Sequence, residues 1–231
     1  MQIDVNILLN SFDLLDLVAL ALFWSCWLTT TFLIERDNAK RPSVHVLMKR
    51  HRYRWMEEMA ARDVRIFDSA ILASIQQSTA FFGSTTLLVI GGIVAILGKP
   101  ETLLSAGEGL MPDWSSQTLQ LELLMVLGIA FYAFLKFVWS NRLFSYCAVV
   151  MASMPNDGTV PEAGRIAIRA ARLNSYAARS FNRGLRGIYY ALTAMAWVLG
   201  AEALIVATVV TTAVLIRREF FSRSRKALIA S

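Results

Sequence analysis

The chain has 231 residues, of which 56% are hydrophobic and only 17% are charged. A soluble domain usually carries about a quarter charged residues, so this composition excludes a soluble globular enzyme as the first interpretation. The net charge is +6, with 23 basic against 17 acidic residues. In a membrane protein such a surplus points first to the anionic cytoplasmic leaflet. Cys26 and Cys147 form neither a disulfide framework nor a metal-ligand spacing.

Four apolar segments are long enough to cross a membrane, whose hydrocarbon core of about 30 Å takes about 20 helical residues. They are residues 14–34, 77–97, 119–139 and 188–216. Each must be helical, because an isolated strand in lipid leaves its backbone polar groups unpaired. The sequence therefore predicts an all-α protein with a single integral membrane domain over residues 1–231. The expected architecture is a four-helix transmembrane bundle with two basic amphipathic cytoplasmic helices.

The charges of the connecting segments predict which way the bundle faces. Segment 35–65 contains nine basic residues against five acidic ones, and segment 140–187 contains seven arginines against two acidic residues. Residues 1–16 contain three acidic residues and no basic residue. Basic loops remain in the cytoplasm, so both basic segments are predicted to be cytoplasmic and the N-terminus to lie outside. The charges therefore predict a membrane protein with several crossings and cytoplasmic basic loops.

The basic tail conflicts with this topology, because a chain that crosses four times should end outside. Five basic residues follow the last apolar segment, namely Arg217, Arg218, Arg223, Arg225 and Lys226. Either the tail is translocated against the usual bias, or segment 188–216 enters and returns as a hairpin that turns at Gly200. Each arm of such a hairpin would be only about 20 Å long, too short to cross fully. Four crossings are therefore the favoured interpretation.

The cytoplasmic segments carry apolar residues at helical spacings with arginines between them, as in basic amphipathic helices that lie along lipid headgroups. One interpretation is that these helices only cover the bundle and follow the positive-inside rule. The other is that they bind anionic lipids or an acidic partner. The candidate docking residues are Arg50, Arg52, Arg54, Trp55, Arg62, Arg165, Arg169 and Arg172. No nucleic-acid-binding motif accompanies the arginines, so nucleic acid is not an expected partner.

Ionisable residues inside the spans are the other candidates for a functional site. Glu202 falls near the middle of segment 188–216 and is expected at mid-membrane, protonated and facing Thr85 or Thr86 across the bundle. Glu122 lies near the outer end of the third span and is expected to reach water. At the cytoplasmic side an ion-paired cluster is expected. Its predicted members are Asp68, Lys136, Asn141 and Arg142.

Several motifs occur in an order that resembles a known family. They are RYRWMEEMAARDVRIFDSAIL and STAFFGSTTLLVIGGI around the second span, KFVWSNRLFSY in the third, and FNRGLRGIYYAL before the fourth. In these motifs the chain resembles, over residues 10–215, bacterial inner-membrane proteins with plant relatives that are catalogued as domain of unknown function 599. The resemblance implies a four-helix membrane protein located in the bacterial inner (plasma) membrane. It implies no activity, cofactor or catalytic residue.

The sequence shows no nucleotide-binding glycine loop and no nucleophile motif, and it predicts no metal and no cofactor. The first functional hypothesis is a non-enzymatic membrane protein that acts through contacts. Its expected partners are the bilayer, anionic lipids, and other membrane-protein subunits or a second copy of itself. The alternative is a small oligomeric channel or transporter with its acidic site at Glu202. A lipid-modifying enzyme that holds a phosphate on the cytoplasmic arginines is the third hypothesis.

Overall fold

The computed structural model describes residues 13–37, 40–106 and 116–229, and every regular element in these ranges is a helix. The all-α class predicted from the sequence is confirmed. The elements are α2 (Leu14–Glu35), α3 (Val44–Ala60), α4 (Ile66–Leu97), α5 (Pro100–Ala106), α6 (Ser116–Ala152), α7 (Pro161–Met195), η1 (Ala196–Leu199), α8 (Ala201–Phe220) and α9 (Arg223–Ile229).

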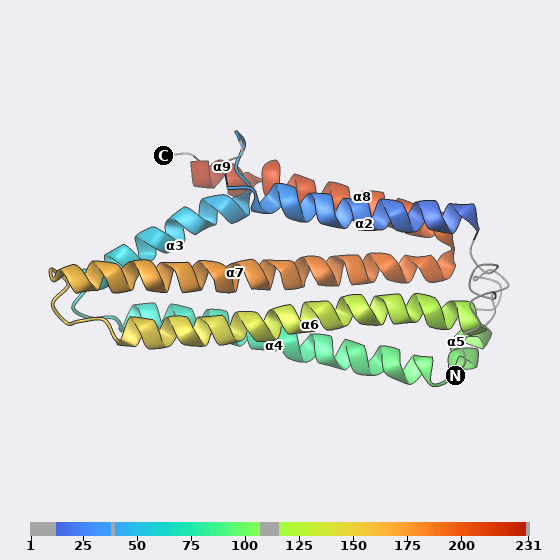
Figure 1. Ribbon diagram of the computed structural model, residues 1–231, viewed down its shortest axis with the longest axis horizontal. Helices are drawn as coiled ribbons and strands as arrows, with labels where there is room; N and C mark the ends of the chain where they lie inside the picture. Colours follow the sequence, from blue (N-terminus) through green and yellow to red (C-terminus); the bar gives the residue numbers. More distant parts are fainter. Residues whose placement is uncertain (1–12, 38–39, 107–115, 230–231) are drawn as a thin grey trace.

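Figure 1 shows an elongated bundle in which the long helices run side by side along one axis. We call one end the basic end; it holds the start of α4 and the connection between α6 and α7, residues 153–160. The opposite end, where α7 is followed by η1 and α8, is the hairpin end. The N-terminal residues 1–12, whose acidic side chains enter the predicted orientation, lie outside the described residues.

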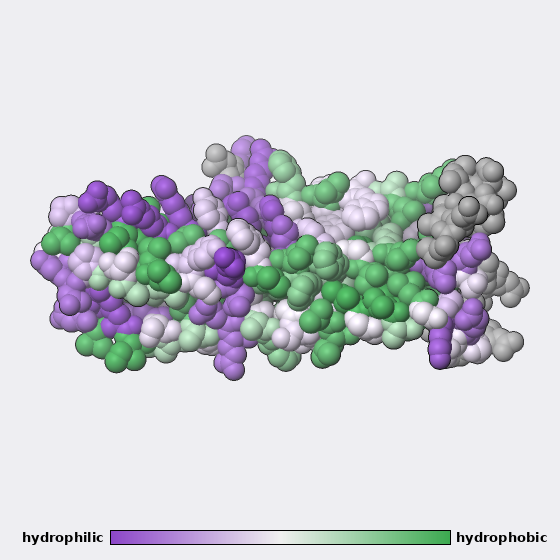
Figure 2. Space-filling view, turned by 60° about the horizontal axis from the view of Figure 1, so that its bottom comes forward, coloured by the Kyte–Doolittle hydropathy of each residue, from purple (hydrophilic) through white to green (hydrophobic). Residues whose placement is uncertain are grey.

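Three of the helices, α2, α4 and α6, are long and apolar enough to cross a membrane. The predicted spans 14–34, 77–97 and 119–139 fall within them. Figure 2 shows apolar side chains gathered in a band over the half nearer the hairpin end, whereas hydrophilic side chains cover much of the basic end. With its 37 residues α6 is about 55 Å long, almost twice the hydrocarbon thickness of about 30 Å. The bundle is therefore too long to be buried in a bilayer along its whole length.

The fourth predicted span, residues 188–216, is wrong as a single straight helix. The chain leaves α7 through η1 and reverses at Gly200, so that α8 runs back beside α7 (Figure 1). The Thr193 and Thr211 hydroxyls lie 2.7 Å apart across the two antiparallel helices. Gly200 has φ 111° and ψ 166°, a conformation that side-chain-bearing residues rarely adopt. This glycine allows an apolar segment to turn without a polar loop.

The hairpin also accounts for the basic tail, because α8 carries the chain back toward the basic end (Figure 1). The two arms of the hairpin are long enough to span a membrane, since α7 and α8 both continue beyond the apolar segment 188–216. The 20 residues of α8 give it a length of about 30 Å. The α7 arm contains Asn174, Ser180 and Arg186, all of which are buried among neighbouring helices. It therefore does not need an apolar surface to lie in the bundle.

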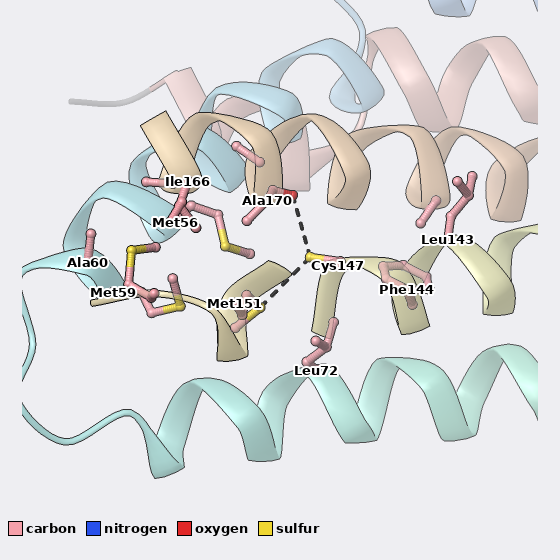
Figure 3. Packing of buried hydrophobic residues seen from close by; sticks show 14 of the residues in the cluster. Met56, Met59, Ala60, Leu72, Leu143, Phe144, Cys147, Met151, Ile166 and Ala170 are labelled. Carbon is pink, nitrogen blue, oxygen red and sulfur yellow. Dashed lines mark hydrogen bonds between the residues drawn. The ribbon is translucent and has the colours of Figure 1, made fainter. Parts of the chain in front are cut away.

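Two hydrophobic cores follow one another along the bundle axis. The first, in the half near the hairpin end, packs Phe23, Trp27 and Tyr190 in ring contacts, with Trp27 stacked on Tyr190 at 5.3 Å. The second lies at the basic end and is rich in sulfur; Met56 and Met59 of α3 pack there against α6 and α7 (Figure 3). The predicted headgroup helix within segment 35–65 is thus α3, and its apolar face covers the bundle.

The interface of α6 and α7 joins both halves and includes one very close approach. Gly184 of α7 lies against Phe137 of α6, so that a Cβ added at Gly184 would meet three ring carbons at 2.8 to 3.0 Å. Phe137 is fully buried and contacts the rings of Phe82 and Phe181. The absence of a side chain at Gly184 therefore lets the two longest helices approach closely.

Candidate functional site

A buried ion cluster joins the end of α2 to α7. Glu35 accepts hydrogen bonds from Arg183, whose Nε and Nη2 lie 2.9 and 2.6 Å from the two carboxylate oxygens, and from Arg186. Arg179 lies 3.9 Å from the same carboxylate. We call these four residues the Glu35 cluster. The Arg186 side chain is only 5% exposed, which makes Glu35 the partner that neutralises a buried charge.

The sequence builds this cluster by spacing its arginines four and three residues apart on α7. Residues at these spacings share one helix face, and here that face meets the last turn of α2. Three guanidinium groups share one carboxylate, so the cluster carries a surplus of positive charge. Such a surplus can attract an anion.

A buried histidine lies beside the Glu35 cluster. The His45 Nδ1 atom is 3.0 Å from Asn182 Nδ2, and the backbone N–H of His45 donates to Glu219 at 3.2 Å. The pKa of His45 is lowered to about 4, mainly by burial; Glu35 raises it, and Arg186 lowers it. The imidazole is therefore neutral at pH 7, and its Nδ1 accepts the hydrogen bond from Asn182.

A groove of about 730 Å³ runs between α2 and α6 toward the Glu35 cluster. Its walls are mostly apolar and aromatic, with Trp24, Trp27 and Leu28 from α2. At one end it reaches Arg36 and Arg183. Concave apolar surfaces with a few polar groups at one end are typical of ligand sites. The groove and the Glu35 cluster together form the candidate functional site.

The predicted ion-paired cluster does not form as expected, because Asp68 has different partners. The fully buried Asp68 accepts hydrogen bonds on Oδ1 from Trp55 Nε1 at 2.7 Å and from Arg62 Nη1 at 2.6 Å. Asp68 lies in the first turn of α4, where it faces the preceding helix α3. Two predicted docking residues, Trp55 and Arg62, therefore bind a buried carboxylate, although 42% of the Arg62 side chain stays exposed.

The other predicted members of that cluster lie elsewhere on α6. Lys136 sits over the ring of Tyr132, 5.2 Å from its centroid. Arg142 donates to the hydroxyl of Tyr146 at 2.5 Å on an exposed face, and the backbone carbonyl of Asn141 accepts from a serine one turn later. The side chains of Lys136 and Arg142 contact tyrosines of their own helix, which depth in the membrane alone could not reveal.

The predicted polar site at mid-membrane is wrong, because it depended on a straight fourth span. Glu202 lies in the first turn of α8, directly after Gly200, and is exposed at the hairpin end. Thr85 is exposed on α4, whereas Thr86 is buried and donates to a carbonyl of its own helix at 2.7 Å.

The remaining predicted docking residues divide by burial. Arg52 is half-buried on α3, and burial lowers its pKa. The others lie exposed on α3 and α7, two helices that pack against each other. They are Arg50, Arg54, Arg165, Arg169 and Arg172. We call these five residues the arginine face.

The expected exposure of one acid near the hairpin end is wrong. Glu122, which was expected to reach water, is fully buried, and within the described part of the chain neither carboxylate oxygen has a hydrogen-bond partner. Asp16 lies close enough for its carboxyl group to interact with that of Glu122 through space. Asp16 itself accepts a hydrogen bond from Trp197 Nε1 at 2.8 Å. The hairpin produces this arrangement, because it brings Trp197 back to the start of α2.

The apolar helices, the apolar band and the two stacked cores define an all-helical protein of the membrane-protein class. No group of three metal-ligating side chains occurs in the ranges that the structure describes. The chain belongs to the family described as protein of unknown function, DUF599, whose model matches residues 18–224. This confirms the family resemblance and extends it through α8. No curated protein and no solved structure matches the chain.

Proposed function

We propose that this protein is an inner-membrane accessory or assembly subunit that acts through contacts, with its basic end in the cytoplasm. The observation that carries the proposal is the continuation of α6 and α7 beyond a membrane-long segment into a second, separately packed core. An extension of this kind presents a rigid surface away from the lipid. A catalytic activity is not needed to explain this extension.

The lengths of the helices support such an extension. The 37 residues of α6 and the 35 of α7 correspond to about 55 and 52 Å, which exceeds a hydrocarbon core by about 20 to 25 Å. The positive-inside rule places the arginine-rich part of these helices in the cytoplasm. The hairpin strengthens this orientation, since it returns the basic tail to the same side.

The far part of the arginine face suits an acidic protein better than the membrane. Arg165 and Arg169 lie 21 and 17 residues before Arg186 on α7, about 31 and 26 Å along the helix. If the Glu35 cluster marks the headgroup level, both distances are about three to four times the Debye length of about 8 Å at physiological ionic strength. Headgroup charges are screened over such distances, so the partner that we propose for Arg165 and Arg169 is an acidic surface of another subunit. Contact with a second copy through the same face would oppose like charges.

The test is a comparison of two double charge reversals that change the net charge equally. Arg165→Glu with Arg169→Glu alters the arginine face, whereas Arg223→Glu with Lys226→Glu alters exposed residues of α9. Each variant is extracted from its native membrane in mild detergent, and the particle mass and thermal unfolding are measured. We expect the first variant to lose the associated subunit while it unfolds at the wild-type temperature.

The matched α9 variant should keep the associated subunit. A wild-type particle that contains one copy of this chain and no other protein would refute the proposal. An Arg165→Glu, Arg169→Glu particle that keeps the same partner as the wild type would also refute it.

A further inference from the structure

The groove between α2 and α6 has a polar end and an apolar end. Its apolar part includes Trp24, Leu28 and Phe32 of α2, which are 43%, 69% and 65% exposed and belong to a helix apolar enough to cross a membrane. α2 packs mainly on α8, and α6 packs on α7 and α4, so the two groove walls are held apart by other helices. The groove therefore stays open without a lid.

Aromatic contacts fix the shape of the groove. Trp27 stacks on Trp24 at 5.3 Å and meets the ring of Tyr132 on the opposite wall at 5.6 Å. Gly128 lines the groove on α6, and a Cβ added there would find no atom within 4 Å. A rigid groove with open space at its wall can hold a chain without first rearranging, which favours binding.

Three cations lie at or beside the polar end. Arg36 follows α2, lines the groove, is exposed, and has no ion pair or hydrogen bond within the described residues. Lys136 of α6 does not line the groove itself, but its Nζ lies 5.2 Å from the centroid of the Tyr132 ring, which does. Arg183 of α7 is 36% exposed although it binds Glu35. Because Glu35 also neutralises Arg186, positive charge remains at this end of the groove.

We propose that the groove binds one anionic phospholipid of the surrounding membrane. One acyl chain lies along Trp24, Trp27 and Leu28, and the headgroup phosphate lies between Arg36 and Lys136. From Trp24 to Arg36 the helix rises about 18 Å, close to half of a hydrocarbon core of about 30 Å. A chain of one leaflet therefore fits the apolar part when its phosphate is at the arginine.

Substitutions in the apolar walls and substitutions of the cations test the two parts of this proposal separately. Gly128→Trp fills the groove, whereas Gly92→Trp adds the same side chain on an exposed face of α4 where a Cβ also meets nothing. Arg36→Gln with Lys136→Gln removes the charges and leaves the walls intact. The matched control for the charges is Arg223→Gln with Lys226→Gln on α9.

The intact protein is reconstituted in nanodiscs of equal parts phosphatidylglycerol and phosphatidylcholine, released into mild detergent, and analysed by native mass spectrometry. We expect the wild type and both controls to retain one phosphatidylglycerol. The preference for phosphatidylglycerol over phosphatidylcholine should fall at least about tenfold in the Arg36→Gln, Lys136→Gln variant, as for the loss of one charge-assisted hydrogen bond. Gly128→Trp should lose both lipids.

Soluble glycerol phosphate, which carries the headgroup charge without an acyl chain, should not displace the lipid. Equal retention of the two lipids by the wild type would overturn the proposal. An unchanged preference after loss of Arg36 and Lys136 would overturn it as well, whether or not Gly128→Trp folds.

Discussion

Removal of the Glu35 carboxylate should destabilise the protein far more than removal of its more exposed partner. Glu35→Ala leaves Arg186, with 5% of its side chain exposed, as a buried charge without its counter-ion. The Nε of Arg186 already lacks an acceptor, and Glu219, the other acid that acts on this guanidinium, forms neither an ion pair nor a hydrogen bond with it in the described residues. Breaking a buried ion pair in this way costs about 3 to 5 kcal/mol of the free energy of unfolding.

Arg183→Ala should lower the free energy of unfolding by only about 1 kcal/mol, because Arg183 is partly exposed and Glu35 keeps Arg186 as its partner. Glu35→Ala combined with Arg186→Met should recover much of the loss, since both buried charges are then absent. Glu58→Ala is the matched surface control, because Glu58 is 57% exposed and pairs with Arg54 only at 3.7 Å.

The measurement is denaturant unfolding in detergent micelles, followed by far-UV circular dichroism and fitted for the free energy of unfolding. The variants should rank, from most to least destabilised, as Glu35→Ala, Arg183→Ala and Glu58→Ala. Equal losses for Glu35→Ala and Arg183→Ala would show that burial of Arg186 does not determine the energetics of the cluster.

Two further predictions use the same assay. Gly184→Ala should lower the free energy of unfolding by about 1 to 3 kcal/mol, because the added methyl group meets the buried Phe137 ring. Gly164→Ala, in open space on the same helix, should raise it by up to about 1 kcal/mol. Equal effects of the two substitutions would contradict the close approach at Gly184. His45 has a pKa of about 4 when folded against 6.5 for the free group, so the unfolded chain binds the extra proton. Stability should therefore fall by about 1.4 kcal/mol per unit as the pH drops from 6.5 toward 4, and His45→Gln should lack this component.

The class of the fold and three of its spans could be predicted because hydropathy reports directly on lipid-facing helices. The hairpin at Gly200 could be named only as the less favoured alternative, since 29 apolar residues give the same signal whether the helix is straight or reversed and each arm within them is too short to cross. The turn depends on a backbone conformation that glycine permits, but a glycine in an apolar segment does not by itself predict a turn. The α7 arm was missed for a related reason, because a helix surrounded by other helices does not need an apolar sequence.

The predicted site failed where it relied on depth alone. Asp68, Lys136 and Arg142 lie on helices that all cross the same region, but their partners depend on which face each side chain occupies. The Glu35 cluster was recoverable in part, since the spacing of Arg179, Arg183 and Arg186 marks one face of α7. What the sequence could not give is the carboxylate on that face, because Glu35 is contributed from about 150 residues earlier in the chain.

The pairing of α2 with α8 has a consequence for biosynthesis. About 165 residues separate the end of α2 from the start of α8, and at about 5 to 20 residues per second their synthesis takes on the order of ten to thirty seconds. For most of that interval Glu35 lacks the arginines of α7, and Asp16 lacks Trp197. Helix α2 thus waits in the membrane with unsatisfied polar groups until α7 and η1 have been made. Truncation before α7 should therefore leave a chain that quality-control proteases recognise by α2.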